Sequence, residues 1–303
     1  MKYLNEYGKS YGTKAEYRFR LEQFKKTKKF ISEHDEKATG HTVGINHMAD
    51  FTAEEYKKLL GFKKPKDFKI DESLKKVETS NQSVGIPDSL DWRQTPGAVS
   101  AVKNQGYCGS CWAFASTAAM ETAYWKNTGT MMTFSEQQLV DCVKDFQNCC
   151  YGCNGGMYYH AWAWLATYNQ GAASDSTYPY KAYEQTCKRS AQPSNQVPYG
   201  LIQPDADNGQ ALREAVAERP IAVAIQAEND AFRSYTSGII KSGCGTDMDH
   251  AVTVVGYGVD TDLTNYFIVK NSWSSGWGES GYVRIAEDQC GITALPLGVT
   301  MAQ

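Results

Sequence analysis

Four polar residues that lie far apart in the sequence have the right types for nucleophilic catalysis. Cys111 follows a Gly-Ser pair at the expected start of a helix, and a helix N-terminus lowers the pKa of a thiol. His250 opens an expected strand and could act as the base, while Asn271 follows another strand and could orient the imidazole. Gln105 lies six residues before the cysteine, so its amide could hold an oxyanion together with the Cys111 backbone N–H. These residues predict a thiolate that attacks a carbonyl group.

The histidine assignment rests on a short list, because residues 84–303 contain only His160 and His250. His160 stands among tyrosines and tryptophans in an expected helix, where a packed or surface histidine is the favoured interpretation. His250 stands at the mouth of a strand, which suits a rigidly held base.

A different chemistry is suggested by the C-x-x-C motif from Cys108 to Cys111, which thiol–disulfide oxidoreductases also contain. A lone C-x-x-C is a weak signal, and the βαβ pattern of thioredoxin is missing. The nine cysteines all lie at or after Cys108, a concentration typical of disulfides in a secreted or lysosomal protein. Nine is an odd number, so at least one thiol is left unpaired. A zinc site is disfavoured because no histidine accompanies the adjacent pair Cys149 and Cys150.

Composition and charge set the class of protein. The chain has 303 residues, 42% of them hydrophobic and 21% charged, which is typical of a soluble globular protein, and no apolar run reaches the ~18–20 residues of a membrane span. The first residues lack an apolar signal core, so either the protein starts in the cytosol or a signal peptide was trimmed before this numbering begins.

The charge is distributed unevenly along the chain. Residues 1–83 contain 18 Lys and Arg against 13 Asp and Glu, whereas residues 84–303 contain 13 Lys and Arg against 21 Asp and Glu. We therefore expect the two parts to attract each other, and the acidic majority argues against nucleic-acid binding.

The hydrophobic pattern predicts an α+β protein with a helical half and a strand-rich half. Thr52 followed by Glu55 predicts a capped helix start, Thr42 to Asn46 predicts an extended piece, and residues 63–85 read as an extended linker. The expected helices cover 14–35, 111–126, 135–140 and 157–168. The expected strands cover 221–226, 251–257, 266–270 and 282–285.

The segment from Gln105 to Phe114, Gln-Gly-Tyr-Cys-Gly-Ser-Cys-Trp-Ala-Phe, resembles the active-site segment of papain and the cathepsins. His250 lies 139 residues and Asn271 160 residues after Cys111, in the family's order. Three further motifs agree, namely Asp-Trp-Arg at 91–93, Cys-Asn-Gly-Gly at 153–156, and Asn-Ser-Trp at 271–273 with Gly-Trp-Gly at 276–278. The resemblance covers essentially the whole chain. It implies a cysteine endopeptidase with a papain-like two-domain fold, in which a helical left domain faces a β-barrel-like right domain.

The N-terminal part resembles the inhibitory propeptide of cathepsin L-type precursors. The ERFNIN-type positions are Glu16, Arg20, Phe24, Ile31 and Asp35, and the GNFD-type positions are Gly44, Asn46, Met48 and Asp50. The resemblance implies a propeptide over 1–83, which runs through the cleft backwards relative to substrate, and a peptidase over 84–303. The helical half would span about 96–195 and the strand-rich half about 196–290, with the termini crossing over. A glycosylation sequon stands at Asn81.

The resemblance also implies which residues meet the substrate. Gly155 and Gly156 would pair their backbone with an extended peptide, although a tight turn is the simpler explanation of two glycines. Trp273 would shield the Asn271–His250 hydrogen bond, although it could equally be a core tryptophan. The S2 pocket would be formed by Met157, Tyr158, Ala224, Met248, Ala251 and Leu295. Asp249 would be a further substrate-binding residue beside this pocket. Since none of those six is a carboxylate, a hydrophobic or aromatic P2 residue is expected and arginine should be rejected.

Three disulfides follow from the resemblance, namely Cys108–Cys153, Cys142–Cys187 and Cys244–Cys290. Cys149 and Cys150 have no counterpart in papain; they could bond to each other, remain free or exchange with Cys153.

Among family subtypes, a cathepsin L-like endopeptidase is favoured. The cathepsin B activity needs a histidine-bearing occluding loop, and the stretch from Cys153 to Cys187 has only His160. A cathepsin H-type tether needs a cysteine in the propeptide, and residues 1–83 contain none. An inactive homologue would normally lack one of the four catalytic residues, and all four are present in this chain.

The expected partners follow from this assignment. We expect a monomer that acts on protein and peptide substrates, with cystatin-like inhibitors as candidate partners. We expect no cofactor, no metal, and no binding to membranes or nucleic acid. We further expect a lysosomal, vacuolar or secreted location and activation at acidic pH, with self-cleavage near residues 80–86.

Overall fold

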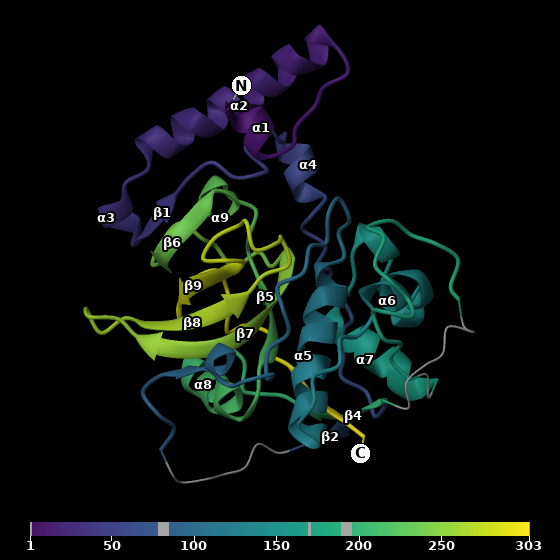
Figure 1. The fold of residues 1–303 in the computed structure, drawn as a ribbon. Coiled ribbons are helices and arrows are strands. Elements are labelled where there is room, and N and C mark those ends of the chain that lie inside the picture. Colours follow the sequence, from purple (N-terminus) through teal and green to yellow (C-terminus); the bar gives the residue numbers. More distant parts are fainter. Residues whose placement is uncertain (1, 78–84, 169–170, 189–195, 303) are drawn as a thin grey trace.

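The computed structural model describes residues 2–77, 85–168, 171–188 and 196–302 (Figure 1). The sequon at Asn81 and the expected boundary after residue 83 lie outside the described residues. Within the described part, the chain forms a helical half, a strand-rich half and an N-terminal segment that packs on both, so the structure has the expected α+β class.

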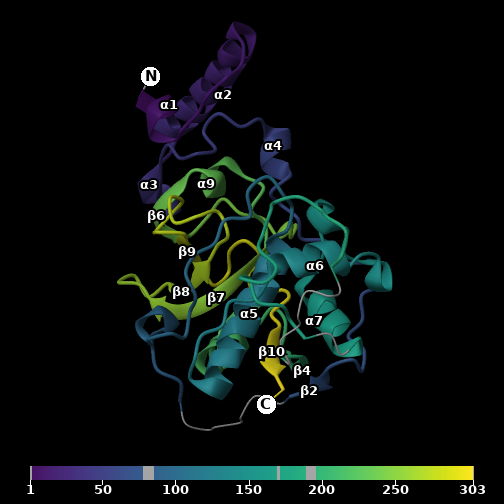
Figure 2. The same cartoon turned by 45° about the vertical axis from the view of Figure 1, so that its right-hand side comes forward.

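The helices of the N-terminal segment lie at one end of the molecule, and the chain then runs to β2 near the opposite end (Figures 1 and 2). Its elements are α1 (Lys2–Glu6), α2 (Lys14–Glu33), α3 (Glu36–Thr39), β1 (His41–Val43), α4 (Ala53–Lys57) and β2 (Lys75–Lys76). Helix α2 ends at Glu33, two residues before the expected end, because the Asp35 side chain accepts hydrogen bonds from the backbone N–H groups of Lys37 and Ala38 and so begins α3. The predicted capping box of Thr52 and Glu55 is present at the start of α4.

The helical half is built around one long, buried helix. Its helices are α5 (Cys111–Thr128), α6 (Glu136–Cys142) and α7 (Tyr158–Thr167), with short 3-10 turns at Phe146–Asn148 and Gly152–Asn154. Small residues such as Ala113, Ala115 and Ala119 allow α5 to be buried on most sides, and the Ser135 side chain caps α6 by accepting from the Gln138 N–H. Figure 1 shows α5 between the sheet on one side and α6 and α7 on the other.

The strand-rich half has a core of its own, which includes Val223, Val254 and Phe267. In the described residues a seven-stranded sheet has the order β1-β6-β9-β8-β7-β3, and β5 also pairs with β7. The strands are β3 (Leu90–Asp91), β5 (Ile221–Ile225), β6 (Tyr235–Ile240), β7 (His250–Val259), β8 (Asn265–Lys270) and β9 (Tyr282–Ala286). A 3-10 turn at Trp92–Gln94, helix α8 (Gly209–Glu218) and helix α9 (Asp230–Arg233) complete this half.

The N-terminal segment is attached by backbone pairing at both ends. Strand β1 pairs antiparallel with β6 and extends the large sheet at its edge. Strand β2 pairs parallel with β4 (Pro198–Ile202), which also pairs with β10 (Gly298–Met301). Between these two anchors the segment passes the N-terminal end of α5, where β7 begins and β8 ends. None of the helices in the described ranges is long and apolar enough to cross a membrane.

Candidate active site

Cys111 begins α5 and is fully buried. Its Sγ accepts two backbone hydrogen bonds, one of 3.4 Å from the N–H of Ala251 and one of 3.3 Å from the N–H of Gly61. The second donor belongs to the N-terminal segment, which therefore touches the candidate nucleophile directly. Burial raises the pKa of the Cys111 thiol to about 12, against the lowering effect of these two N–H groups. The sequence-based expectation of a lowered pKa is wrong for this form of the protein, because the N-terminal segment removes water from the thiol.

His250 and Asn271 are hydrogen-bonded as predicted. The His250 ring opens β7, and its Nε2 lies 2.9 Å from Oδ1 of Asn271, which directly follows β8. The same Oδ1 accepts a second hydrogen bond, of 2.8 Å, from the backbone N–H of Ser272, which identifies this atom as the amide oxygen. Because an oxygen can only accept here, Nε2 of His250 is the nitrogen that carries the proton. The Nδ1 atom of His250 is buried and has no hydrogen-bond partner among the described residues. Nδ1 is therefore the ring nitrogen that is free to accept the proton of the Cys111 thiol.

The Trp273 ring lies over this histidine. The two ring centroids are 4.8 Å apart with the planes inclined by 31°, and Trp273 is itself buried. Burial lowers the pKa of His250 to about 4, opposed by the hydrogen bond to Asn271. Burial thus disfavours both charged forms, the thiolate of Cys111 and the imidazolium of His250, while the N-terminal segment is in place.

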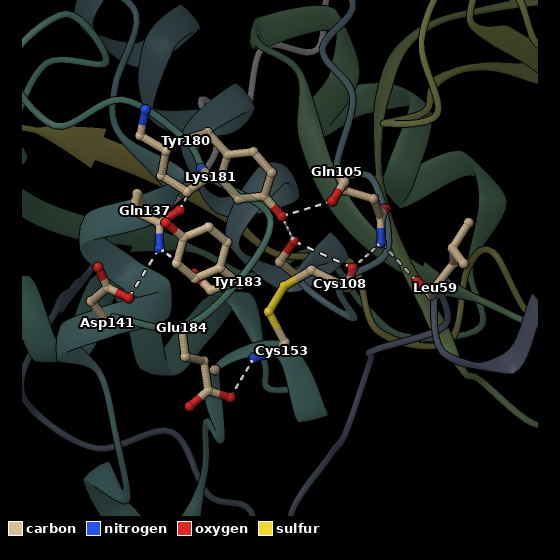
Figure 3. Close-up of a disulfide and its surroundings, with 12 residues drawn as sticks. Leu59, Gln105, Cys108, Gln137, Asp141, Cys153, Tyr180, Lys181, Tyr183 and Glu184 are labelled. Atoms are coloured by element: carbon tan, nitrogen blue, oxygen red, sulfur yellow. Dashed lines mark hydrogen bonds between the residues drawn. A yellow bond between two sulfur atoms is a disulfide. The ribbon is translucent and has the colours of Figure 1, made fainter. Parts of the chain in front are cut away.

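Gln105 is held so that its amide nitrogen faces the cleft. Its Oε1 accepts hydrogen bonds from the Ser272 hydroxyl at 2.7 Å and from Nε1 of Trp273 at 3.2 Å. Its Nε2 donates to the carbonyl oxygens of Leu59 and Cys108, each at 2.8 Å, as Figure 3 shows. The Leu59 carbonyl belongs to the N-terminal segment. The Leu59 carbonyl oxygen therefore occupies the Gln105 amide N–H that was expected to hold an oxyanion.

The N-terminal segment crosses the site as an extended chain. The N–H of Gly156 donates a hydrogen bond of 2.9 Å to the carbonyl oxygen of Gly61, and the Gly156 carbonyl oxygen accepts one of 2.8 Å from the N–H of Lys63. These two bonds form a parallel β-bridge between Gly156 and Phe62. On the other side, the Phe62 N–H donates 2.8 Å to the carbonyl of Asp249. Of the two glycines expected to pair with an extended peptide, Gly156 makes such a pair here.

Gly155 serves a turn instead. Its N–H reaches the carbonyl of Gly152 at 3.4 Å and its φ is 110°, a conformation that suits glycine. A Cβ at Gly155 would lie 2.8 Å from the carbonyl oxygen of Gly61, so the residue also permits close approach of the passing chain.

The six residues expected to form S2 belong to the same apolar cluster as Phe62. The Phe62 ring stacks on Tyr158 at a centroid distance of 5.8 Å and an interplanar angle of 25°. The same apolar cluster contains Met157, Ala224 and Ala251 as buried members and Met248 and Leu295 as partly buried ones. Phe62 therefore fills this pocket with an aromatic side chain.

Asp249 contributes its backbone to the groove rather than its side chain. The carboxylate accepts hydrogen bonds from the N–H groups of Ala227 and Glu228, at 2.8 and 3.0 Å. Burial raises the pKa of this carboxyl to about 6. Its position beside His250 follows from the sequence, but its role as a backbone acceptor for Phe62 does not.

Disulfides join Cys108 to Cys153, Cys142 to Cys187 and Cys244 to Cys290, which are the three expected pairs. Because Cys108 is bonded to Cys153 (Figure 3), it cannot form the dithiol with Cys111 that an oxidoreductase would need. Cys111, Cys149 and Cys150 are free.

Several residues around the site were not predicted. Leu59 and Gly61 block the site, and Ser272 orients Gln105. Tyr180 donates 2.8 Å to the Gln105 carbonyl. Ser272 lies within the Asn-Ser-Trp motif and could have been found there, and Gly61 is a glycine in a lysine-rich stretch. Nothing in the sequence around Tyr180 indicated its contact.

Both uncharged and charged contacts join the N-terminal segment to the body. The Tyr56 hydroxyl donates a hydrogen bond of 2.6 Å to the carbonyl of Ala227, and Nδ2 of Asn46 donates one of 2.7 Å to the carbonyl of Arg233. Lys57 and Glu228 form an ion pair at 2.8 Å, whose side chains are about half exposed (47% and 45%). A single pair of this exposure contributes little to stability.

Comparison with known families decides the identity of the chain. A family model described as "Papain family cysteine protease" matches residues 86–300. The chain belongs to the papain family of cysteine proteases. A second model, "Cathepsin propeptide inhibitor domain (I29)", matches residues 1–56, so the N-terminal segment is a propeptide.

The papain-family relatives include plant proteases and precursors. The chain is 37% identical to Ananain from Ananas comosus over 99% of its own length and 86% of the relative's. It is 39% identical to Cysteine proteinase RD21A from Arabidopsis thaliana, of whose length it spans 60%. Among solved structures, digestive procathepsin L2 proteinase from the larval midgut of Tenebrio molitor matches at 36% identity with a TM-score of 0.88, covering 99% of this chain and 98% of that one. A recombinant stem bromelain precursor matches at 35% identity with a TM-score of 0.87, covering 100% and 97%.

Proposed function

We propose that this papain-family protein is the zymogen of a cathepsin L-like cysteine endopeptidase whose nucleophile is Cys111. The observation that carries the proposal is the arrangement around that thiol: a histidine fixed in one tautomer by Asn271, an amide donor on Gln105, and a peptide backbone already lying along Gly156. An extended peptide in this groove brings a carbonyl between the thiol and the amide.

The reaction follows from the chemistry of these groups. Once the propeptide has left and water enters, His250 Nδ1 takes the proton of Cys111, and the thiolate attacks the carbonyl carbon of the substrate. Gln105 Nε2 and the Cys111 backbone N–H stabilise the oxyanion. The imidazolium then donates its proton to the leaving amine, which releases one product and leaves an acyl-enzyme. Water activated by His250 hydrolyses that thioester and restores the thiol.

Specificity is proposed to come from the pocket that Phe62 occupies in the zymogen. Its walls are apolar or aromatic, and the nearest carboxylate in the groove, Asp249, is held by the backbone N–H groups of Ala227 and Glu228. An arginine at P2 would lose its hydration without gaining a charged partner, whereas Phe or Leu would bury apolar surface.

Activation at acidic pH is proposed to begin with the propeptide histidines rather than with surface carboxylates. Burial under β6 lowers the pKa of His41 below its ordinary value of 6.5, and burial together with Lys9 lowers the pKa of His47 to about 4. A histidine whose pKa is depressed in the docked state binds a proton more readily when undocked. Docking is therefore favoured above about pH 6.5 and loses stability as the pH falls below it.

The proposed partners follow from this activity: protein and peptide substrates, the propeptide as intramolecular inhibitor, and cystatin-like inhibitors that enter the same groove. A monomer in an acidic lysosomal or vacuolar compartment, or a secreted one, would fit an enzyme that carries three disulfides and activates in acid.

The test is peptide cleavage by the whole chain. Protein incubated at acidic pH with reductant should cleave a peptide with Phe or Leu at P2 and shorten itself, and the Cys111→Ala chain should do neither. Equal cleavage by both chains would overturn the proposal.

A further inference from the structure

Two adjacent free cysteines lie beneath the groove that holds the propeptide, and the peptidase chemistry does not use them. Sγ of Cys149 and Sγ of Cys150 are only 3.1 Å apart, and both residues are buried. Sγ of Cys150 also lies 3.9 Å from the carbonyl of Met157 at the start of α7. The pair therefore sits between a loop and a helix of the substrate groove.

The loop that carries the pair has an unusual backbone. Asp145, Gln147, Asn148 and Cys150 all have φ between 52° and 67°, a left-handed region that L-residues with a Cβ rarely adopt. Such conformations cost free energy, and they concentrate at sites where the geometry serves a purpose. Here the left-handed residue at Cys150 accompanies the close approach of the two sulfur atoms.

A histidine accompanies the pair. His160, on α7, is buried, and its Nδ1 has no hydrogen-bond partner among the described residues. A hydrogen bond from Cys150 lowers the pKa of the Cys149 thiol to about 6 against the effect of burial, and His160 acts in the same direction as that bond. Burial raises the pKa of Cys150 well above its ordinary value. One sulfur is thus disposed to be a thiolate at neutral pH and its neighbour to remain a thiol.

The propeptide covers this site in the zymogen. The Lys63 carbonyl lies 4.0 Å from Sγ of Cys149, and the Phe68 ring lies 5.6 Å from the His160 ring. Cys149 is only 2% exposed. When the propeptide leaves, the Lys63 carbonyl and the Phe68 ring leave with it.

We propose that Cys149 is a second reactive thiol of this protein, oxidised by hydroperoxides once the propeptide has gone, with Cys150 as its resolving partner. The Cys149 thiolate attacks one oxygen of the peroxide, the O–O bond breaks, and the second oxygen leaves as water or an alcohol after taking a proton. The resulting sulfenic acid is attacked by the Cys150 thiol, which loses its proton, and a second molecule of water departs as the S–S bond forms. Two thiols are oxidised and one peroxide is reduced.

The product should be easy to reduce again. Consecutive Cα atoms are about 3.8 Å apart across a trans peptide, whereas disulfides usually span about 4.4 Å or more, so a ring between adjacent cysteines is strained. Strain of this kind makes the oxidation reversible by ordinary thiols.

The ring would also reach the substrate groove. A Cβ on Gly156 would lie 3.0 Å from Sγ of Cys150, so the sulfur packs directly beneath the backbone that pairs with the propeptide. An effect of oxidation on peptide binding rests on the proposed peptidase function, whereas the oxidation itself does not.

The test uses the Cys111→Ala chain, whose remaining free thiols are Cys149 and Cys150. The propeptide is removed with a trace of trypsin, which does not depend on any activity of the protein, and a matched sample is kept full length. Both are treated with one equivalent of hydrogen peroxide, and their intact masses and peptide maps are followed. The trimmed chain should lose two hydrogen atoms at Cys149–Cys150 about tenfold or more faster than the full chain, and dithiothreitol should reverse the change. Equal rates in the two forms, or oxidation at any other cysteine, would overturn the proposal.

Three variants of the same trimmed chain sharpen the test. Cys150→Ser should accumulate a sulfenic acid on Cys149 that dimedone traps, and Cys149→Ser should not react. His160→Gln should shift the half-maximal rate to higher pH, whereas Tyr159→Phe on the same helix should leave the pH profile in place. An unchanged pH profile in His160→Gln, or dimedone capture in Cys149→Ser, would contradict the assigned roles.

Discussion

The backbone N–H of Gly61, in the propeptide, donates a 3.3 Å hydrogen bond to Sγ of Cys111. This contact places the inhibitory segment on the candidate nucleophile itself rather than over the entrance of the groove. Burial at this contact raises the pKa of the Cys111 thiol, because little water is left to stabilise a thiolate.

Replacing Gly61 with alanine should release the inhibition. A Cβ at this position would lie 1.9 Å from the carbonyl oxygen of Gly109, which is backbone and cannot turn aside. The segment must then lift from the site, so iodoacetamide should label Cys111 in the full-length chain about tenfold or more faster at neutral pH. The matched control is Gly12→Ala, where an added Cβ meets only the Glu16 side chain at 3.8 Å. Equal labelling of the two variants would contradict the contact.

The pH of activation should depend on His41. Its pKa is lowered by burial against β6, so protonation favours the undocked propeptide, and docking is lost as the pH falls below about 6.5. In His41→Phe the ring remains but cannot take a proton, so the midpoint pH of propeptide loss should fall by about half a unit or more. The measurement is the fraction of full-length chain after incubation across pH 4 to 7, with an added protease as the trimming agent. A midpoint that does not move would show that other groups govern release.

The fold could be predicted best where the chain has strong local signals. The buried helix α5 and the strands β5, β7, β8 and β9 follow from alanine-rich and β-branched runs, and the Thr52–Glu55 capping box fixes the start of α4. Strand β6 was missed because Tyr235–Ile240 reads Tyr-Thr-Ser-Gly-Ile-Ile, and its pairing with β1 and β9 is long-range. Helix α8 was also missed, although Asn208 caps it and its buried residues Leu212, Ala215 and Val216 recur at helical spacing.

The site could be predicted in its members but not in its charge state. The sequence indicated Cys111, His250, Asn271 and Gln105, and the structure brings them together. It could not indicate that burial shifts the pKa of the thiol upward and that of the imidazole downward, because this burial involves the chain around Gly61, which lies 50 residues before Cys111 and 189 before His250. The hydrogen bond from Ser272 that fixes Gln105 likewise depends on the folded geometry.

Gln105→Ala should slow the chemical step in the trimmed enzyme. The amide that now donates to the Leu59 carbonyl would no longer be available to an oxyanion, and loss of one such donor lowers kcat by about 10²–10³-fold. The control is Gln138→Ala, which removes another buried glutamine that accepts from the Ala173 N–H far from the thiol. That variant should lose stability on urea denaturation but keep its kcat. A Gln105→Ala enzyme with full kcat would remove Gln105 from the mechanism.

Leu295→Glu should change the preference at P2. Leu295 lines the pocket that Phe62 fills, so a carboxylate there gives an incoming arginine a charged partner. The ratio of kcat/KM for Arg over Phe at P2 should rise about tenfold or more. Leu263→Glu, at a position 82% exposed beyond the end of β7, is the control and should leave the ratio unchanged. The pocket assignment fails if the two variants behave alike.

The most direct measurement follows the Cys111 thiol and the enzymatic activity in the same sample. The wild-type chain is shifted to acidic pH, and portions are withdrawn over time and returned to neutral pH. One half of each portion is assayed with a peptide carrying Phe at P2, and the other is labelled with iodoacetamide and mapped by mass spectrometry. With a thiol pKa of about 12 in the zymogen, Cys111 should be nearly unreactive at the start, and its labelling should rise in step with cleavage as the propeptide is lost. Cleavage that rises without labelling of Cys111, or survives complete labelling of it, would contradict the assignment of Cys111 as the nucleophile.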